Sequence, residues 1–390
     1  MPSDTVELMN TSESPLPGLM GEARAAGALA LDTEFMGEGR YRTLLCLVQI
    51  AVPGRIELLD PLDENLDGAP LAQVLADPAI EVVVHAGRQD VALLRRWLGC
   101  EVRNVFDTQV AAGFAGMGAQ SSYETLLGQV LDLRVAKSAS FTRWDARPLS
   151  QEQLGYARED VLHLLELAAE LQRRLRASGR LAWARQECQA LEQASDVRDP
   201  DTIFARLPRV RNLNVASQGI ARELVAWREQ CAAAGDRPVQ SVLADPVLVE
   251  IAKRRPTTPA QLHDIRGAGQ SAVRRRTDDV LDAVRRGRER PHEPLQDTVR
   301  HRPPDAEDAP LVALAEALVR ARTREANLAY ELLAARADLQ AIVTAWRASA
   351  AEADVRTLQG WRRELVGAEL LELLHGRVRL SVSDGRLRID

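Results

Sequence analysis

Three strand-like segments in succession, followed by alternating helix and strand patterns, most constrain what this chain can fold into. Residues 28–35 alternate small or acidic side chains with larger ones, which is the period of two of a half-buried strand. A long apolar run at 43–52 and a short segment at 55–59 follow, the second of them after the turn signal Pro53-Gly54. The sequence therefore predicts a meander of three strands.

Helices and strands interleave beyond residue 60. The predicted elements are helices at 70–76 and 88–98 and strands at 80–84 and 104–106. The clearest helix covers residues 150–178, because Ser150 and Gln153 have the Ser-x-x-Gln form of a capping box and an apolar stripe follows in steps of three and four. This order predicts an α/β domain with a mixed sheet flanked by helices.

Polar and Pro-rich stretches divide the chain into segments. Residues 195–202 and 291–310 have the composition of linkers. The predicted order is a flexible N-terminus at 1–20, the α/β domain at 21–194, a linker at 195–202, an all-helical domain at 203–290, a linker at 291–310, and a further helical domain at 311–390 that ends in a hairpin around Asp384-Gly385.

Acidic and basic residues are unevenly distributed along the chain. Residues 1–190 carry 18 Lys and Arg against 26 Asp and Glu, whereas residues 203–290 carry 17 against 10. An acidic segment followed by a basic one is typical of a catalytic domain joined to a domain that binds a polyanion. The candidate nucleic-acid contacts in the basic segment are Lys253, Arg254, Arg255, Arg274, Arg275 and Arg276.

The composition argues against a membrane protein and against a disulfide-rich secreted one. No apolar run approaches the ~18–20 residues that a membrane span needs, and the N-terminus lacks a basic head followed by an apolar stretch. The cysteines are scattered without a CxxC pair, which argues against a structural zinc site. We therefore expect a cytoplasmic protein that does not contact a membrane, and a monomer is favoured.

Two acids on the first predicted strand are candidate metal ligands. Asp32 and Glu34 are two residues apart, so both carboxylates project from the same face of the strand. Ala28 and Ala30 precede them on that face and leave room. Adjacent carboxylates repel one another, and a bound cation commonly offsets this repulsion.

Further candidates lie on predicted helices. Tyr156 and Asp160 are four residues apart and share one helix face, where a phenol hydroxyl can orient a water beside a carboxylate. Asp90 lies in the first turn of another predicted helix, a place where an acid is also common for electrostatic reasons alone. Only the joint pattern of these acids indicates a site.

Together these segments resemble the DEDD superfamily of 3′→5′ exonucleases. LDTEF at 31–35 is similar to its first motif, HAGRQD at 85–90 to the second, and YARED at 156–160 to the third. In the third motif Tyr156 stands four residues before Asp160 and is preceded by Gly155, so the motif resembles that of the tyrosine subclass. Over residues 20–190 the segments YRTLLCLVQIA, FDTQVAAGF and ARPLSQEQLGYAREDV narrow the resemblance to ribonuclease D, although the polar residues around Trp144 depart from the usual form.

A second resemblance concerns the basic segment. The stretch from RELVAWREQ to QLHDIRG is similar to the HRDC domain, a helical module of RecQ-type helicases and of ribonuclease D. The resemblance implies an exonuclease domain at 21–194 and an HRDC domain at 203–290. Residues 311–390 are interpreted as a second, diverged copy.

The resemblance to ribonuclease D implies hydrolysis of RNA with two divalent cations, Mg²⁺ or Mn²⁺. It implies that one cation sits on Asp32, Glu34 and Asp160, and that a second is shared by Asp32 and reached by Asp90. Tyr156 would orient the attacking water. The substrate would be RNA, with transfer-RNA precursors that carry 3′ extensions as the natural candidates. Further candidate substrate contacts are Phe35, Met36, His85 and Arg147.

Two alternatives remain open at this point. The acids do not separate RNA from DNA, so a 3′→5′ DNA exonuclease is one alternative. A non-catalytic scaffold that binds nucleic acid is the other, and the presence of all the motif acids argues against it.

Overall fold

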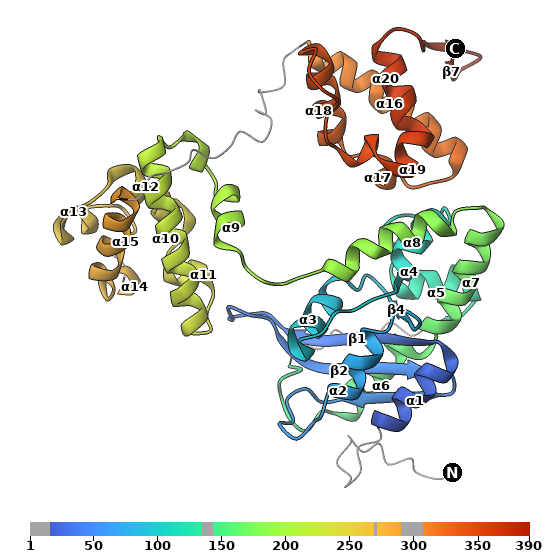
Figure 1. Cartoon of the computed structure of the whole chain (residues 1–390), viewed down its shortest axis with the longest axis horizontal. Helices are drawn as coiled ribbons and strands as arrows, with labels where there is room; N and C mark the ends of the chain where they lie inside the picture. The colour runs from blue at the N-terminus through green and yellow to red at the C-terminus, as the bar shows by residue number, and fades with distance from the viewer. Residues whose placement is uncertain (1–15, 135–142, 269–270, 290–306) are drawn as a thin grey trace.

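The computed structural model describes residues 16–134, 143–268, 271–289 and 307–390 (Figure 1). The N-terminal α/β part carries the five-stranded sheet, and helices make up almost all of the rest. Among the described residues, the helices are all too short or too polar to cross a lipid bilayer.

The sheet has the strand order β3-β2-β1-β4-β5. The bounds are β1 (Ala28–Met36), β2 (Leu44–Val52), β3 (Arg55–Leu59), β4 (Glu81–Val84) and β5 (Val105–Asp107). The first three pair as an antiparallel meander, whereas β4 runs parallel to β1 and β5 parallel to β4. The predicted meander and mixed sheet are therefore confirmed, and the carboxyl ends of β1, β4 and β5 meet at one edge.

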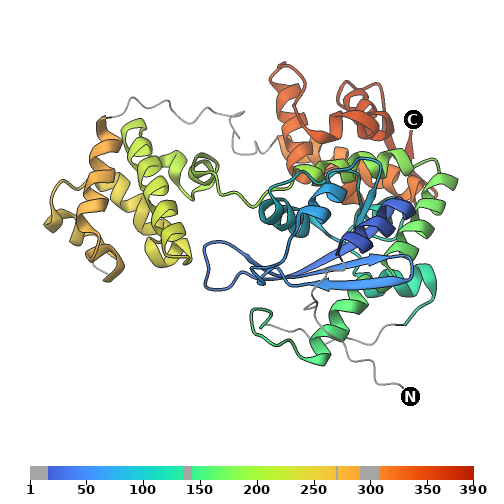
Figure 2. The ribbon, with the colours of Figure 1, turned by 60° about the horizontal axis from the view of Figure 1, so that its bottom comes forward.

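Helices cover both faces of this sheet (Figure 2). The helices α1 (Leu16–Ala26), α2 (Ala69–Leu75) and α3 (Arg88–Leu98) share one apolar core with Leu29 and Leu31 of β1. The opposite face, which includes Ala30 and Leu47, is covered by α6 (Gln151–Leu162) and α7 (Leu164–Ala177). The remaining helices of this part are α4 (Thr108–Phe114), α5 (Tyr123–Leu131) and α8 (Leu181–Gln189), which is followed by a 3₁₀ turn at Ala190–Gln193.

The predicted flexible N-terminus at 1–20 is wrong for its last residues. Helix α1 begins at Leu16, and the side chains of Leu16, Leu19 and Met20 are fully buried against the sheet. Their apolar burial outweighs the Pro and Ser that surround them in the sequence. Residues 1–15 lie outside the described residues.

The single helix predicted at 150–178 is also wrong, because it breaks at His163. The capping box of Ser150 and Gln153 is present and starts α6 as predicted. At His163 the backbone N–H donates to the hydroxyl of Tyr123, 3.2 Å away, and α7 begins at the next residue. A tertiary hydrogen bond therefore replaces a helical one, and a side-chain pattern does not reveal it.

The first predicted linker is shorter than 195–202. Asp199 caps α9 (Pro200–Arg206) by accepting from two backbone N–H groups, so the linker ends there. The helices that follow are α10 (Val215–Ala234), α11 (Val239–Val242), α12 (Asp245–Arg254), α13 (Pro259–His263), α14 (Ser271–Arg274) and α15 (Thr277–Glu289), with a 3₁₀ turn at Val210–Asn212. They enclose an apolar core of their own.

The second predicted linker, 291–310, lies mostly outside the described residues, and it ends early because α16 begins at Asp308. The C-terminal helices are α16 (Asp308–Ala326), α17 (Tyr330–Leu333), α18 (Arg336–Arg347), α19 (Gly360–Arg362) and α20 (Ala368–Leu374), with a 3₁₀ turn at Arg356–Leu358 and a π-helical turn at Arg363–Gly367. Strands β6 (Leu380–Ser383) and β7 (Arg386–Ile389) form the predicted hairpin.

Both helical parts contact the α/β part. The indole of Trp361 stacks on Trp183 with ring centroids 5.2 Å apart, and Arg362 forms an ion pair of 2.6 Å with Glu187. On the other side, the loop between β1 and β2 reaches the end of α10 (Figure 2), where Arg40 lies 3.0 Å from Asp236. The basic helical part thus contacts the loop that follows the strand carrying Asp32.

Candidate active site

Strand β1 presents Asp32 and Glu34 on one face. In its antiparallel register with β2, Asp32 faces Gln49 and Glu34 faces Leu47. Directly paired residues point to the same side of a sheet, here the side covered by α6. Thr33 points to the opposite side. The period of two therefore places the carboxylates as the sequence predicts.

Helix α6 brings Asp160 to this pair. Leu154, Ala157 and Val161 are buried toward the sheet, which fixes the rotation of the helix about its axis. Asp160 then offers a carboxylate oxygen within 4.8 Å of oxygens of Asp32 and Glu34. Acids that are more than a hundred positions apart in the sequence thus form one cluster.

Asp90 approaches from the other side of the sheet. It lies in the first turn of α3, is 7% exposed, and accepts a hydrogen bond from the hydroxyl of Thr33. Asp90 is not within the 4.8 Å group formed by the other acids, although it is close enough to raise the pKa of Asp32 and Glu34. The Thr33 hydroxyl therefore holds Asp90 next to the group of Asp32, Glu34 and Asp160, but outside it.

Asp107, which our sequence analysis missed, fixes the start of α3. Its carboxylate accepts from the backbone N–H groups of Ala86 and Gly87, and it also caps α4. Ala86 has φ of 53°, an unfavourable conformation for a residue with a Cβ, and these bonds help to hold it. An acid directly after a predicted strand and before a helix pattern was the available signal, and it indicates only a helix cap.

Burial and mutual repulsion raise the pKa of the clustered acids. Burial is the main cause for Asp32, followed by the charges of Asp90, Asp160 and Glu34. Burial first and Asp160 second raise the pKa of Glu34 to about 8. For Asp160, burial raises the pKa to about 7 although the hydrogen bond from Tyr156 opposes the shift.

This arrangement fits divalent cations. Hard cations prefer carboxylate oxygens, and the cluster supplies several within reach of one another. The buried Oδ2 atom of Asp160 has no hydrogen-bond partner among the described residues. Within the same residues none of Asp32, Glu34, Asp90 and Asp160 forms an ion pair with Lys or Arg, so no described basic side chain balances the charge of the cluster.

We expect opposite effects of pH on the metal-free and the metal-loaded protein. Groups whose pKa is raised on folding hold protons that the unfolded chain releases, so the metal-free protein loses stability as pH rises from about 4 through 7 to 8. Cations compete with these protons, so stabilisation by Mn²⁺ should grow over the upper part of that range. Melting temperatures at pH 6.0 and 8.5, with EDTA or Mn²⁺, test this.

Glu34→Gln is the control for the pH experiment. It removes one of the raised acids, so the fall in stability of the metal-free protein with pH should be shallower than in the wild type. An equal stabilisation by Mn²⁺ at both pH values would contradict the assignment of the cluster.

Tyr156 stands one turn before Asp160 and donates a hydrogen bond to its carboxylate. Burial, followed by the charge of Asp160, raises the pKa of the Tyr156 phenol above its usual value. The ring lies 6.0 Å from that of Trp144. A phenol that keeps its proton can orient a water but is a poor base at neutral pH.

The substrate contacts predicted near the acids have different surroundings in the structure. Met36 shares the face of Asp32 and packs with the core around Tyr156, whereas Phe35 lies on the opposite face and is 39% exposed. His85 is hydrogen bonded to Thr108 at 2.9 Å and lies beside Tyr123. Arg147 binds both carboxylate oxygens of Asp60 and three backbone carbonyls, which favours a structural role.

The basic candidates also differ. Arg255 directly follows α12 and donates to Ser217 and Asn214, and Arg254 pairs with Glu250 at 2.6 Å. Lys253 is exposed and lines a groove of about 610 Å³. Arg274 and Arg275 are exposed and Arg276 is half-buried. Exposure alone therefore does not separate Arg274 and Arg275 from Lys253 and Arg254.

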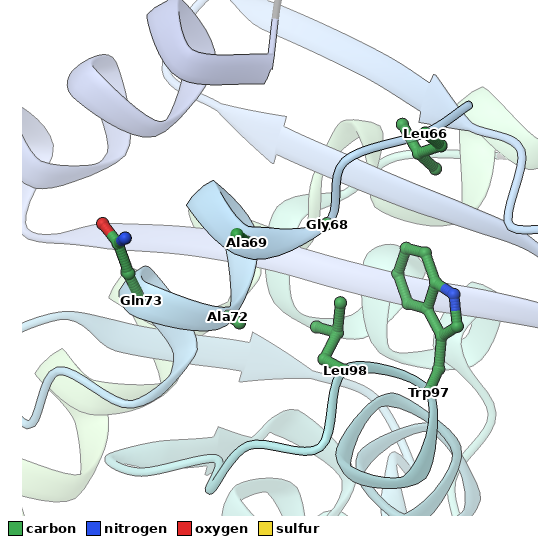
Figure 3. A pocket seen from close by; sticks show the side chains of 7 residues that line it. All are labelled: Leu66, Gly68, Ala69, Ala72, Gln73, Trp97 and Leu98. Atoms are coloured by element: carbon green, nitrogen blue, oxygen red, sulfur yellow. The ribbon is translucent and has the colours of Figure 1, made fainter. Parts of the chain in front are cut away.

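A separate pocket of about 430 Å³ lies between α2 and the end of α3 (Figure 3). Trp97 and Leu98 line it on one side and Leu66 and Gln73 on the other. Its lining contains no acid, histidine or cysteine. This pocket offers no group for hydrolysis and is not part of the candidate site.

Comparisons with known proteins agree with this fold and site. Residues 9–176 match the family model for 3′-5′ exonucleases, and residues 217–284 match the model for HRDC domains. The sheet, the clustered acids and the helical module thus define a metal-dependent 3′→5′ exonuclease with an HRDC domain.

Relatives of nearly equal length specify the family. Ribonuclease D of Granulibacter bethesdensis is 36% identical over 97% of this chain and 95% of its own length, and that of Gluconacetobacter diazotrophicus is 35% identical over 98% and 96%. The structure of Escherichia coli RNase D, an exoribonuclease involved in structured RNA processing, superposes with a TM-score of 0.80 at 27% identity, covering 93% of this chain and 96% of that one. This chain belongs to the ribonuclease D family of 3′→5′ exoribonucleases.

Proposed function

We propose that this enzyme trims structured RNA, transfer-RNA precursors above all, from the 3′ end and releases 5′ mononucleotides. The observation that carries the proposal is the convergence of Asp32, Glu34 and Asp160 within 4.8 Å, with Asp90 beside them. The E. coli relative acts on structured RNA, which supports the substrate class.

Two cations of the Mg²⁺ or Mn²⁺ type fit these ligands. Asp32, Glu34 and Asp160 would hold one, and Asp32 together with Asp90 would hold the other. When bound, such a pair lowers the pKa of a water and neutralises charge on the departing oxygen. Thr33 and Asp107 act earlier, because they fix where Asp90 stands before any substrate enters.

The chain's own groups orient the reaction. The Tyr156 hydroxyl, held by Asp160, would direct a water toward the terminal phosphate. Met36 packs beside Tyr156 and would contact the last nucleoside. Phe35 and His85 remain proposed contacts at the rim.

The helical parts would hold the RNA behind its 3′ end. Arg40, in the loop after β1, contacts Asp236 of the HRDC domain, whose exposed Arg274 and Arg275 would supply positive charge. We propose the same role for Lys253, Arg254 and Arg276. We also propose that residues 311–390 are a second, diverged HRDC domain and that the enzyme works as a monomer.

Replacing Arg274 and Arg275 together by alanine should weaken RNA binding and leave hydrolysis of a short oligonucleotide nearly unchanged. Each lost phosphate contact reduces the slope of log affinity against log salt by about 0.7 for a single strand. Binding of a 3′-extended transfer RNA at 50–200 mM salt measures this. Arg285→Ala is the control, since that arginine pairs with Asp282 at 3.0 Å. An unchanged slope would show that these arginines do not meet RNA.

The decisive experiment compares substrates. A 3′-extended transfer RNA, a matched single-stranded RNA and the same sequence in DNA are incubated with the enzyme and Mg²⁺ or Mn²⁺, with EDTA as control. We expect nucleotides to be removed one at a time from the RNA 3′ end. Faster trimming of the DNA would replace the proposal by a DNA exonuclease, and binding without hydrolysis in Mn²⁺ would replace it by a scaffold.

A further inference from the structure

Gln49 is a buried amide that the fold does not satisfy. Its side chain is 0% exposed, and neither Oε1 nor Nε2 has a hydrogen-bond partner among the described residues. Burying an amide without partners is costly, and such groups are rare in native proteins. A glutamine in the middle of the apolar strand LLCLVQIAV therefore needs a reason.

The strand register shows what Gln49 lies next to. It is paired directly with Asp32 on β1 and with Leu58 on β3, so all three side chains point to the face covered by α6. The flanking positions on this face are Ala30 and Ala51 on one side and Leu47 on the other. On these strands the polar groups nearest to the amide are thus the carboxylates of the active site.

The surroundings favour a partner in the acid cluster. Paired residues across an antiparallel sheet have Cβ atoms about 4.5–5.5 Å apart, and a glutamine is long enough to bring its amide to a neighbouring aspartate. Asp32 itself accepts a backbone hydrogen bond from Thr33, which leaves further acceptor sites on its carboxylate. An amide N–H is the complementary donor.

We propose that Gln49 is a positioning residue of the active site, whose Nε2–H group donates to the Asp32 carboxylate through one water and fixes its orientation for metal binding. The inference rests on the proposed role of Asp32 as a metal ligand. Carboxylates that bind metals are commonly held by such outer partners, and removing one costs about 10–100-fold in metal affinity or activity.

Gln49→Met tests this, because it keeps the volume and removes the amide. The effects on kcat, Mn²⁺ affinity and melting temperature distinguish an amide that positions Asp32 from one that only stabilises the fold. If Gln49 positions Asp32, kcat and Mn²⁺ affinity measured by calorimetry should each fall about 10–100-fold, with KM for a short RNA within about twofold and the melting temperature unchanged or raised. Gln49→Leu, which is shorter, provides the same comparison if the methionine does not fit.

Two variants make the outcome specific. Leu47→Met changes the neighbouring position on the same face and should retain wild-type Mn²⁺ affinity. Asp32→Asn tests the ligand itself: if it binds Mn²⁺ and hydrolyses RNA normally, the proposed site is wrong. If Asp32→Asn fails while Gln49→Met matches the wild type in kcat and Mn²⁺ affinity, only the role of Gln49 is wrong. A large fall in melting temperature for both Gln49 variants would also overturn it.

Discussion

Asp160→Asn is expected to abolish RNA hydrolysis. Asparagine has nearly the same shape but replaces a carboxylate oxygen by an amide, so the cluster with Asp32 and Glu34 loses a charge and a ligand. We expect turnover to fall by more than about 10³-fold, beyond the 10–100-fold that loss of an outer partner costs. Release of mononucleotides from a 3′-extended RNA measures it.

The same substitution should leave the stability of the metal-free protein unchanged or raise it. The Oδ2 atom of Asp160 has no partner among the described residues, and removing its charge relieves the repulsion that raises the pKa of Glu34. The metal-free variant should therefore melt at or above the wild-type temperature at pH 8.5, whereas its stabilisation by Mn²⁺ should be largely lost. Glu159→Gln, which removes an exposed charge next to Asp160, is the matched control and should stay active. More than a tenth of normal turnover in Asp160→Asn would refute the metal-ligand role.

Tyr156→Phe should give the second largest effect, and a graded one. The phenol donates to Asp160 and is placed to orient a water, but its raised pKa keeps it protonated, so it is not available as a base near neutral pH. Loss of such a group costs about 10²–10⁴-fold in turnover. We expect kcat to fall by that factor, with KM nearly unchanged.

Tyr123→Phe separates this role from general damage. Tyr123 also lies near the acids, but its hydroxyl accepts the backbone N–H of His163 where α6 gives way to α7. Its loss should lower the melting temperature and reduce turnover by less than about tenfold. If the Tyr156 variant lost as much activity as Asp160→Asn, the hydroxyl would have to do more than orient a water.

Local sequence patterns predicted the parts of the site that depend on short-range geometry. The period of two put Asp32 and Glu34 on one face of β1, and the capping box of Ser150 started α6, which carries Tyr156 and Asp160. These features follow from backbone repeats and end effects that need no distant partner. The resemblance of the motifs to the exonuclease superfamily supplied the link between them.

Contacts between distant segments decided the rest. The break at His163 depends on Tyr123, and the burial of Leu16, Leu19 and Met20 depends on a sheet that forms later in the sequence. Asp107 could not be distinguished from an ordinary helix cap until the turn at Ala86 was seen against it.

The sequence by itself determined which helix or strand each acidic residue lies on and which way its side chain faces, because strand and helix periods are local properties. Only the tertiary structure decided that Asp160 closes on Asp32 and Glu34, that Thr33 keeps Asp90 just outside that group, and that Gln49 is buried opposite Asp32. The physical reason is that distances between such segments are set by packing across the sheet, and no pattern within one segment contains them.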